Sequence, residues 1–368
     1  MSTVSANTIL DATGGNTATI NGATPTVYNT MGKNRIINSA MEIDQRNAGS
    51  SVTPTNGQYL VDRWQATTNV SSKFSVQQST EAPAGFSYSM KATSLSAYSI
   101  GAGELTGLRQ HIEGYNCNDL DFGTSDAKTV TLSFWVRSSL TGTFGVSLMN
   151  GSANYSYPAT YTISSADTWE YKTITITGAT AGTWSTTTST GMSVLFGLGV
   201  GTSLSGTAGS WAAAGYYGAT GATSVVGTNG ATFYITGVQL EVGSVATEFE
   251  RRPYGMELAL CQRYYEKSYS IDVVPGTATA NGLVYMSTGN SVAGDKAVTA
   301  TFKVEKRSNP SISYWDSPGN ASRVDSGGTN RVGAINWQNT VSVNIRNNAG
   351  GGYGSADIGY QFVASAEL

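Results

Sequence analysis

Short segments in which apolar and polar residues alternate recur from residue 34 onward, separated by clusters of Gly, Asn, Ser and Thr. The clearest segment is 129–137, in which alternate residues are apolar: Val130, Leu132, Phe134 and Val136. Because successive side chains of a strand point to opposite faces, this pattern predicts a half-buried strand, with Trp135 on the other face. Many short strands of this kind are typical of an all-β sandwich or barrel.

The same alternation predicts further strands at residues 74–78, 108–112, 144–148, 170–176, 192–198 and 232–242. In the last of these, the apolar positions change parity across Gly237, which indicates a glycine bulge that bends the strand. Between residues 179 and 230 the chain is nearly uncharged and rich in Gly, Ser, Thr and Ala. A connection of this length is expected to carry contacts or function.

Changes in composition divide the chain into four parts. Residues 1–33 are poor in charge and cannot bury a core, so we expect an extended arm that orders against a partner. Residues 34–252 form the first β unit, residues 253–270 a helical linker, and residues 271–368 a second, smaller antiparallel sandwich.

The linker has the one convincing helical pattern of the sequence. Pro253 is suited to starting a helix of about ten residues. Its apolar stripe comprises Met256, Leu258, Leu260, Cys261, Tyr264 and Tyr265. The stripe must be buried, either against its own domain or against copies of itself around a symmetry axis.

The overall charge excludes several function classes. Charged residues make up 12% of the chain, about half the usual share of roughly 25%. With 21 Lys and Arg against 24 Asp and Glu, the chain lacks the basic surface that nucleic-acid binding needs. No run of 18 apolar residues predicts a membrane span, and the first residues do not resemble a secretion signal, so we expect assembly in a cytoplasm. Cys117 and Cys261 are predicted to be buried free thiols.

Catalytic chemistry is not favoured. The single histidine, His111, lies in a predicted strand without a nucleophile motif nearby, and we interpret it as an ordinary solvent-facing residue. A pair of carboxylates could serve a glycosidase, and the available acids include Asp44, Asp62, Glu104, Glu113, Asp119 and Asp121. The acidic stretch 116–121 could offer oxygen ligands to calcium, although its spacing is more typical of an Asx-rich turn. We predict no catalytic residue, no metal and no cofactor.

Aromatic side chains are the remaining candidates for ligand binding. Tyr and Trp offer flat apolar faces with a polar edge, which suits stacking on sugar rings. In the second β unit the candidates are Tyr314, Trp315, Asp316, Trp337 and Tyr353. The alternative is that most of these aromatic residues belong to a core or a subunit interface, and Tyr314 alternates with Ile312 as a core residue would.

Several motifs in residues 29–265 resemble the tail fibre or receptor-binding proteins of bacteriophages, especially the type of aquatic phages. The first motifs are residues 29–41 (Asn-Thr-Met-Gly-Lys-Asn-Arg-Ile-Ile-Asn-Ser-Ala-Met), Gln45-Arg46, Asp62-Arg63-Trp64, residues 109–114 (Arg-Gln-His-Ile-Glu-Gly) and residues 130–136. The most specific motifs are residues 235–243 (Ile-Thr-Gly-Val-Gln-Leu-Glu-Val-Gly), residues 249–253 (Phe-Glu-Arg-Arg-Pro) and residues 261–265 (Cys-Gln-Arg-Tyr-Tyr). Looser matches follow at Thr301-Phe302, residues 306–310 and residues 364–368.

This resemblance implies a jelly roll like that of carbohydrate-binding modules for the first β unit, and a homotrimer with a variable distal domain. It implies trimer contacts at Met256, Leu260, Cys261, Tyr264 and Tyr265, because cyclic symmetry lets identical patches close. We therefore expect a non-enzymatic virion component that docks on other phage tail proteins through its arm. Its second β unit would bind a host cell-surface glycan, of lipopolysaccharide or capsule type. Three copies per fibre would multiply a modest affinity per site.

Three alternatives remain open. The chain could be a carbohydrate-binding module of a bacterial surface protein or enzyme, which a monomeric state would favour. It could be a tailspike that depolymerises the host capsule, which release of reducing ends would reveal. It could also be a structural decoration protein of the tail, which would not bind host cells.

Overall fold

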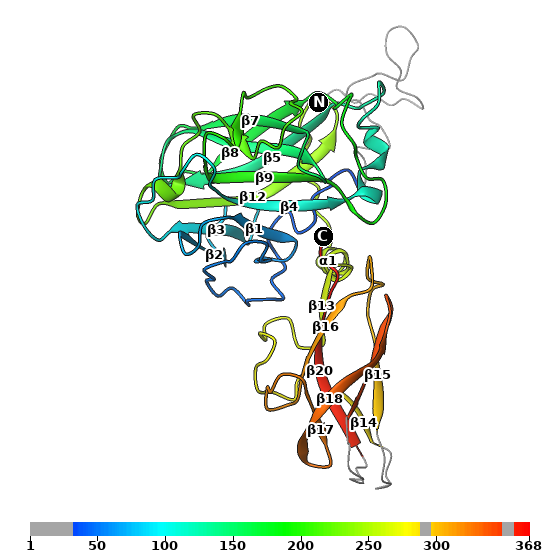
Figure 1. Ribbon diagram of the computed structural model, residues 1–368. Coiled ribbons are helices and arrows are strands. Elements are labelled where there is room, and N and C mark those ends of the chain that lie inside the picture. Colours follow the sequence, from blue (N-terminus) through cyan, green and yellow to red (C-terminus); the bar gives the residue numbers. More distant parts are fainter. Residues whose placement is uncertain (1–31, 288–295, 348–356) are drawn as a thin grey trace, which may run out of the picture.

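The computed structural model describes residues 32–287, 296–347 and 357–368. In these residues the chain forms two β units joined by one α-helix, α1 (Tyr254–Gln262). Figure 1 shows the larger unit above this helix and the smaller unit, in orange and red, below it. The prediction of an all-β chain, with a jelly-roll sandwich, a short helix and a smaller β-sandwich, is confirmed. Nearly all of the predicted N-terminal arm, residues 1–31, lies outside the described residues.

Two five-stranded antiparallel sheets form the jelly roll. The order of the first sheet is β1 (Trp64–Thr68), β4 (Leu105–Glu113), β9 (Thr190–Val200), β6 (Gly142–Asn150) and β7 (Ser156–Ile163). The order of the second sheet is β2 (Phe74–Ser79), β3 (Ser89–Ser94), β12 (Thr232–Val242), β5 (Val130–Ser138) and β8 (Glu170–Ile176). Strands far apart in sequence are thus neighbours. For example, β12 is the central strand of the second sheet and lies between β3 and β5.

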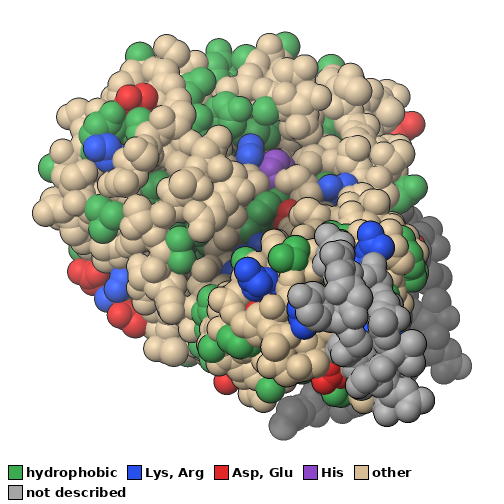
Figure 2. Space-filling model, turned by 60° about the horizontal axis from the view of Figure 1, so that its bottom comes forward, with side chains coloured by type: hydrophobic (Ala, Val, Ile, Leu, Met, Phe, Trp, Pro, Cys, Tyr) green, Lys and Arg blue, Asp and Glu red, His purple; other side chains and the backbone are tan. Residues whose placement is uncertain are grey.

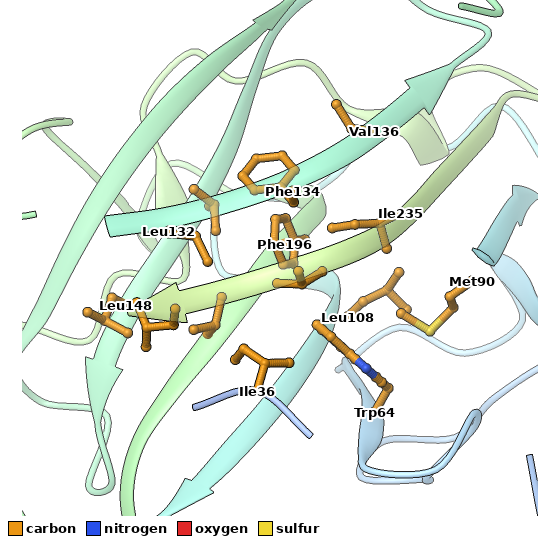
Figure 3. Close-up of a cluster of buried hydrophobic side chains, with 14 of the residues drawn as sticks. Ile36, Trp64, Met90, Leu108, Leu132, Phe134, Val136, Leu148, Phe196 and Ile235 are labelled. Carbon is orange, nitrogen blue, oxygen red and sulfur yellow. The ribbon is translucent and has the colours of Figure 1, made fainter. Parts of the chain in front are cut away.

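The core lies between these two sheets. The inward residues of β5 predicted from the alternation, such as Phe134, are at most 1% exposed. The ring centroid of Phe134 lies 5.0 Å from that of Phe196 on β9, at an interplanar angle of 78°. Such edge-to-face packing is the preferred geometry of aromatic pairs in protein cores. Figure 3 shows these two rings meeting between the sheets, with Trp64, Leu108 and other apolar side chains around them.

The bulge predicted in β12 is present. The pairing of β12 with β5 shifts register between Thr236 and Gln239, and Gly237 has a φ of +60°. A side chain is disfavoured there by this backbone conformation, and also by space, because a Cβ atom would lie 2.7 Å from the ring of Phe86. Glycine therefore allows the strand to bend and an aromatic ring to approach its outer face.

The long uncharged connection predicted between residues 179 and 230 contains β9 and then covers the outer face of the first sheet. Ser147 Oγ on β6 donates to the carbonyl of Tyr216 at 2.6 Å, and Ser156 Oγ on β7 donates to that of Ala214 at 2.7 Å. The connection also contains two short strands, β10 (Ser205–Gly206) and β11 (Gly218–Ala219), which pair in parallel. Its contacts explain why polar residues on the outer side of β6 and β7 are buried.

The second unit is one antiparallel sheet that bends around its own core. Its strand order is β13 (Tyr265–Lys267), β20 (Asp357–Ser365), β17 (Arg323–Ser326), β18 (Thr329–Gln338), β19 (Ser342–Asn347) and β15 (Ala297–Thr301). Two more strands, β14 (Val284–Ser287) and β16 (Ser311–Trp315), also pair with β20. The hydroxyl of Tyr360 on β20 donates to the carbonyl of Val298 on β15 at 3.0 Å, so these strands face each other across the core.

Helix α1 packs against its own chain. It ends at Gln262, before the predicted stripe does, because Tyr265 already pairs with Ser365 in β13. The exposed fraction of Cys261 and Tyr264 is 0%, and both pack against Ile37 and Ile43 of the first unit. Of the two alternatives for burial of the stripe, the structure shows the contact with the chain's own domain.

The predicted trimer contacts differ in exposure. Cys261, Tyr264 and Tyr265 are buried within one chain and offer little surface to another copy, so their role as trimer contacts stays a prediction. Leu260 is half-buried against the same cluster, and Met256 is 54% exposed.

The two cysteines, Cys117 and Cys261, are buried and free, as predicted. Burial raises the pKa of both thiols, that of Cys117 to about 12.

The two units meet in a set of buried charged contacts, which we call the joint. On one side, Arg263 donates to both oxygens of Glu113 at 2.9 and 2.6 Å, and the Tyr264 hydroxyl donates to the same carboxylate at 2.6 Å. Burial raises the pKa of Glu113, but these hydrogen bonds outweigh it and hold the pKa below its usual value. Glu113 therefore remains ionised beside its arginine.

On the other side of the joint, Glu367 forms ion pairs with Arg46, at 2.6 Å, and with Arg63. Arg63 is 1% exposed, donates to the carbonyl of His111 at 2.7 Å, and lies 3.6 Å above the ring of Tyr264. The hydroxyl of Tyr59 donates to the carbonyl of Leu368 at 2.8 Å. Figure 1 shows the C-terminus beside α1, between the two units.

No helix in the described part of the chain is long and apolar enough to span a membrane.

Candidate functional site

The predicted ligand residues of the second unit do not form one site. Tyr314 and Trp315 are neighbours on β16, so their side chains point to opposite faces of the sheet. Tyr314 packs against the second core, whereas the ring of Trp315 lies 6.2 Å from that of Tyr269. Trp337 is 43% exposed on β18, which does not pair with β16, and Tyr353 lies outside the described residues.

Asp316 is a turn residue. Its side chain is fully buried and accepts hydrogen bonds from the backbone N–H of Asn320 at 2.7 Å and from the Asn320 side chain at 3.1 Å. The carboxylate is occupied by this turn and faces no ligand. In this structure Asp316 stabilises a turn and the partly buried ring of Tyr314 packs against the second core, so the ligand-binding role of these two residues stays a prediction.

The outer face of the second jelly-roll sheet presents an aromatic pair. Trp135 on β5 and Tyr171 on β8 are opposite each other in the ladder, with ring centroids 5.4 Å apart at an angle of 49°. Tyr171 is 43% exposed. Two further rings, Phe86 and Phe249, come from loops and meet edge to face at 5.0 Å.

These rings border a cavity of about 390 Å³, which we call the aromatic site. Its lining residues are Ala84, Phe86, Ser133, Trp135, Tyr171, Gly237, Ala246, Thr247, Glu248, Phe249 and Arg251. The cavity falls within the range of about 300–1,000 Å³ that is usual for small-molecule sites.

The motif 235–243 explains how the walls of this site are held. Gly237 leaves the space that Phe86 occupies against the sheet, and its Cβ position would also lie 3.2 Å from Trp135. The buried carboxylate of Glu241 accepts from the backbone N–H of Thr247 at 2.8 Å and from its hydroxyl at 2.6 Å. Gln239 Oε1 accepts from the backbone N–H of Glu250 at 2.8 Å. Residues 247–250 are thereby fixed over the sheet.

Arg251 is the cation of the site. Its guanidinium carbon lies 4.8 Å from the ring centroid of Phe86 and 5.6 Å from that of Phe249. In the described residues its side chain forms these ring contacts but no hydrogen bond or ion pair, and it is exposed. The guanidinium can therefore donate to a ligand that stacks on the aromatic pair.

This arrangement suits a sugar ring. The apolar C–H face of a pyranose can stack on Trp135 and Tyr171, while the rim offers the exposed carboxylate of Glu248 and the guanidinium of Arg251. The alternation in residues 129–137 predicts that Trp135 lies on the face opposite the core, but the pattern alone assigns it no role. A large aromatic residue on the solvent side of a strand was the available signal, whereas the contribution of Phe86 and Phe249 depends on loop positions.

The histidine has no acidic partner that would make it a catalytic base. His111 faces outward on β4, with Nδ1 2.8 Å from Ser193 Oγ, but it is more covered than predicted. Burial and, to a smaller extent, the positive charges of Arg109 and Arg63 together lower its pKa to about 2. The side chain is therefore neutral and acts as a hydrogen-bonding residue of the sheet.

The carboxylates considered for catalysis all take part in contacts that hold the fold. Asp44 accepts three backbone N–H groups, from Arg46, Asn47 and Gly49. The other five have these partners: Asp62 with Gln45, Glu104 with Tyr98, Glu113 with Arg263, Asp119 with Arg35, and Asp121 with Lys128. The stretch 116–121 contains a turn of 3-10 helix at Asn118–Leu120, which follows another at Gly114–Asn116.

No protein-family model matches the sequence, and no curated protein matches it. Similar solved structures include the enzymatically active domain of tailspike protein 4 of bacteriophage CBA120, with 12% identity over 52% of this chain and a TM-score of 0.30. This match spans 21% of the tailspike chain. A C-terminal family 22 carbohydrate-binding module of Clostridium thermocellum matches 52% of this chain and 99% of its own, with 16% identity and a TM-score of 0.28. A family 11 module of the same organism, in complex with a mixed-linked tetrasaccharide, matches 54% and 98%, with 10% identity and a TM-score of 0.28.

Proposed function

We propose that this chain is a bacteriophage tail fibre protein that attaches the virion to its host by binding a cell-surface glycan. The observation that carries the glycan-binding part is the pair of half-buried Trp135 and exposed Tyr171, bordered by two more rings and the guanidinium of Arg251. Flat aromatic faces with hydroxyl and charged groups at the rim stack on sugar rings and bind their hydroxyls. The receptor-binding role thus moves from the second unit to the jelly roll.

The virion part of the proposal is supported by the motifs that resemble tail fibres. Gln239 and Glu241 belong to these motifs, and each holds a backbone segment beside the aromatic site. In this proposal residues 1–33 dock on other tail proteins, and the chain works without catalysis. The surface in Figure 2 is mostly uncharged polar side chains and backbone, which suits contact with hydroxyl-rich polymers.

Substitution of Trp135 by alanine is expected to weaken glycan binding at least tenfold, since it removes half of the stacking surface. The measurement is binding of the full-length protein to an array of bacterial lipopolysaccharide and capsule oligosaccharides. Tyr171→Ala should have a similar effect. Trp337→Ala is the matched control, because Trp337 is as exposed as Tyr171 and lies in the second unit.

Loss of binding in Trp337→Ala, with normal binding in Trp135→Ala, would contradict the aromatic site. It would assign receptor binding to the second unit, as the sequence predicts. Release of reducing ends from any bound oligosaccharide would contradict the non-enzymatic proposal and favour a depolymerase.

The proposal includes a homotrimer, whose contacts need exposed apolar side chains. Three such side chains on β18 and the turn after it are 40–53% exposed: Val332, Ile335 and Val341. Burial of such side chains between copies would remove apolar surface from water. We expect light scattering to give three times the mass of one chain.

The variant Val332→Asp should reduce that mass to one chain, because a charge would be placed in the contact. Leu95→Asp, which changes a side chain that is 45% exposed in the first unit, is the control and should remain trimeric. A monomeric wild-type protein would contradict the fibre and favour an isolated carbohydrate-binding module.

A further inference from the structure

A second cavity lies where the jelly roll, the start of α1 and the segment after β13 meet. Its volume is about 620 Å³, and we call it the seam cavity. Its lining residues are Glu42, Asp44, Ala48, Gln78, Ser87, Tyr88, Arg251, Arg252, Tyr254, Ile271 and Asp272. Arg251 also lines the aromatic site, and it is the one residue on both lining sets. The seam cavity is therefore a separate space, with Arg251 in the wall between the two.

Part of the lining is fixed by contacts within the protein. Asp44 accepts the backbone N–H groups of the loop after it, and Gln78 Nε2 donates to the carbonyl of Met41 at 2.6 Å. Arg252 donates to the carbonyl of Ile36 at 3.1 Å and forms an ion pair with Glu257 at 3.4 Å. These residues build a wall that exists before any ligand arrives.

The other polar groups of the lining are free to bind a ligand. In the described residues, the carboxylates of Glu42 and Asp272 and the guanidinium of Arg251 form no hydrogen bond or ion pair, although the charges of Arg251 and Glu257 act on Glu42. Glu42 is half-buried and Asp272 is exposed. Their carboxylates come from opposite units of the chain. A ligand between them would receive acceptors from both sides.

Aromatic surface completes the cavity. Tyr254 is 49% exposed, Tyr88 is half-buried, and both offer a ring and a hydroxyl. A sugar residue combines an apolar face with hydroxyls that donate and accept, so it can use all of these groups together. An acidic sugar would face two unpaired carboxylates against one guanidinium, which favours a neutral ligand.

We propose that the seam cavity is a second carbohydrate site, which binds a neutral sugar residue between Glu42 of the first unit and Asp272 of the second. The two carboxylates accept hydrogen bonds from sugar hydroxyls, Arg251 donates to a ring or hydroxyl oxygen, and Tyr254 covers one face of the ring. This site is additional to the aromatic site and does not require it.

The test uses the full-length protein on an array of immobilised neutral and uronic-acid-containing oligosaccharides. The double variant Glu42→Gln and Asp272→Asn keeps the shape of both side chains and removes both carboxylates. We expect it to lose at least tenfold in binding to a set of neutral oligosaccharides that Trp135→Ala still binds. Asp126→Asn, another exposed aspartate outside both cavities, is the control and should bind as wild type does.

Unchanged binding of the double variant to every oligosaccharide would overturn the seam site, while the aromatic site would stand if Trp135→Ala lost binding. Equal loss on neutral and acidic oligosaccharides would also overturn it, because the two carboxylates would then give no preference. A melting temperature equal to that of wild type shows that the variant is folded.

Discussion

Replacement of Arg63 by methionine is expected to lower the free energy of unfolding by about 3 kcal/mol or more, as when one member of a buried ion pair is removed. Arg63 is 1% exposed and pairs with Glu367, which is 8% exposed. Methionine would preserve much of the apolar stem that packs on Tyr264 but would leave part of the Glu367 charge without a partner. The measurement is the midpoint of thermal and denaturant unfolding of the full-length protein.

Arg137→Met is the matched control for this prediction. Arg137 also has two acidic partners, Glu81 and Asp167, but these are 50% and 58% exposed. Water screens such pairs, and they contribute about 0–1 kcal/mol. If both variants lost the same stability, the burial of the joint would have no energetic consequence and the prediction would be wrong.

Asp62 is expected to make the protein less stable as the pH rises from about 4 to about 7. Its side chain is 1% exposed, and burial raises its pKa to about 7, although Arg46 and the hydrogen bond from Gln45 act in the opposite direction. At a pH between the pKa of Asp62 in the unfolded chain and its pKa in the folded protein, the folded protein holds a proton that the unfolded chain releases. The contribution of Asp62 to the free energy of unfolding is therefore fully present below about pH 4. It falls by about 4 kcal/mol between about pH 4 and about pH 7, at 1.36 kcal/mol per pKa unit.

The Asp62→Asn variant isolates this effect, because asparagine does not titrate. Denaturant unfolding of both proteins from pH 4 to pH 8 should show a difference in stability that changes between pH 4 and pH 7 in favour of the variant and is constant above. Other titrating groups, such as His111, are shared by both proteins and cancel. A difference that is the same at every pH would show that Asp62 is ionised throughout.

Local patterns in the sequence were sufficient to predict strands. The parity change at Gly237 predicted both the strand Thr232–Val242 and its bulge. The alternation has a period of two residues, so one inserted residue changes the parity of every apolar position after it. The alternation in residues 129–137 likewise predicted which side chains of β5 face the core. These features depend only on neighbours along the chain.

Contacts between distant segments could not be predicted in this way. The helix stripe showed that Cys261 and Tyr264 must be buried, but the partners that bury them, Ile37 and Ile43, are more than 200 residues earlier in the chain. An apolar stripe on a helix can be buried against copies of itself around a symmetry axis or against its own domain, and the sequence pattern is the same in both cases. The aromatic site has the same origin, since it needs a strand residue, Trp135, and loop residues from two other places.

The last residues of the chain give the second unit a second attachment to the first. Beside the covalent connection through α1 and β13, the N–H of Ala366 donates to the carbonyl of Tyr264 at 2.7 Å, and Glu367 and Leu368 contact Arg63 and Tyr59. A body fixed at two points cannot swivel about one of them. A pull on the far end of the second unit would load the paired strands β13 and β20 in shear. The force would reach the jelly roll along the same direction, and the second unit would detach at the rate at which the joint opens.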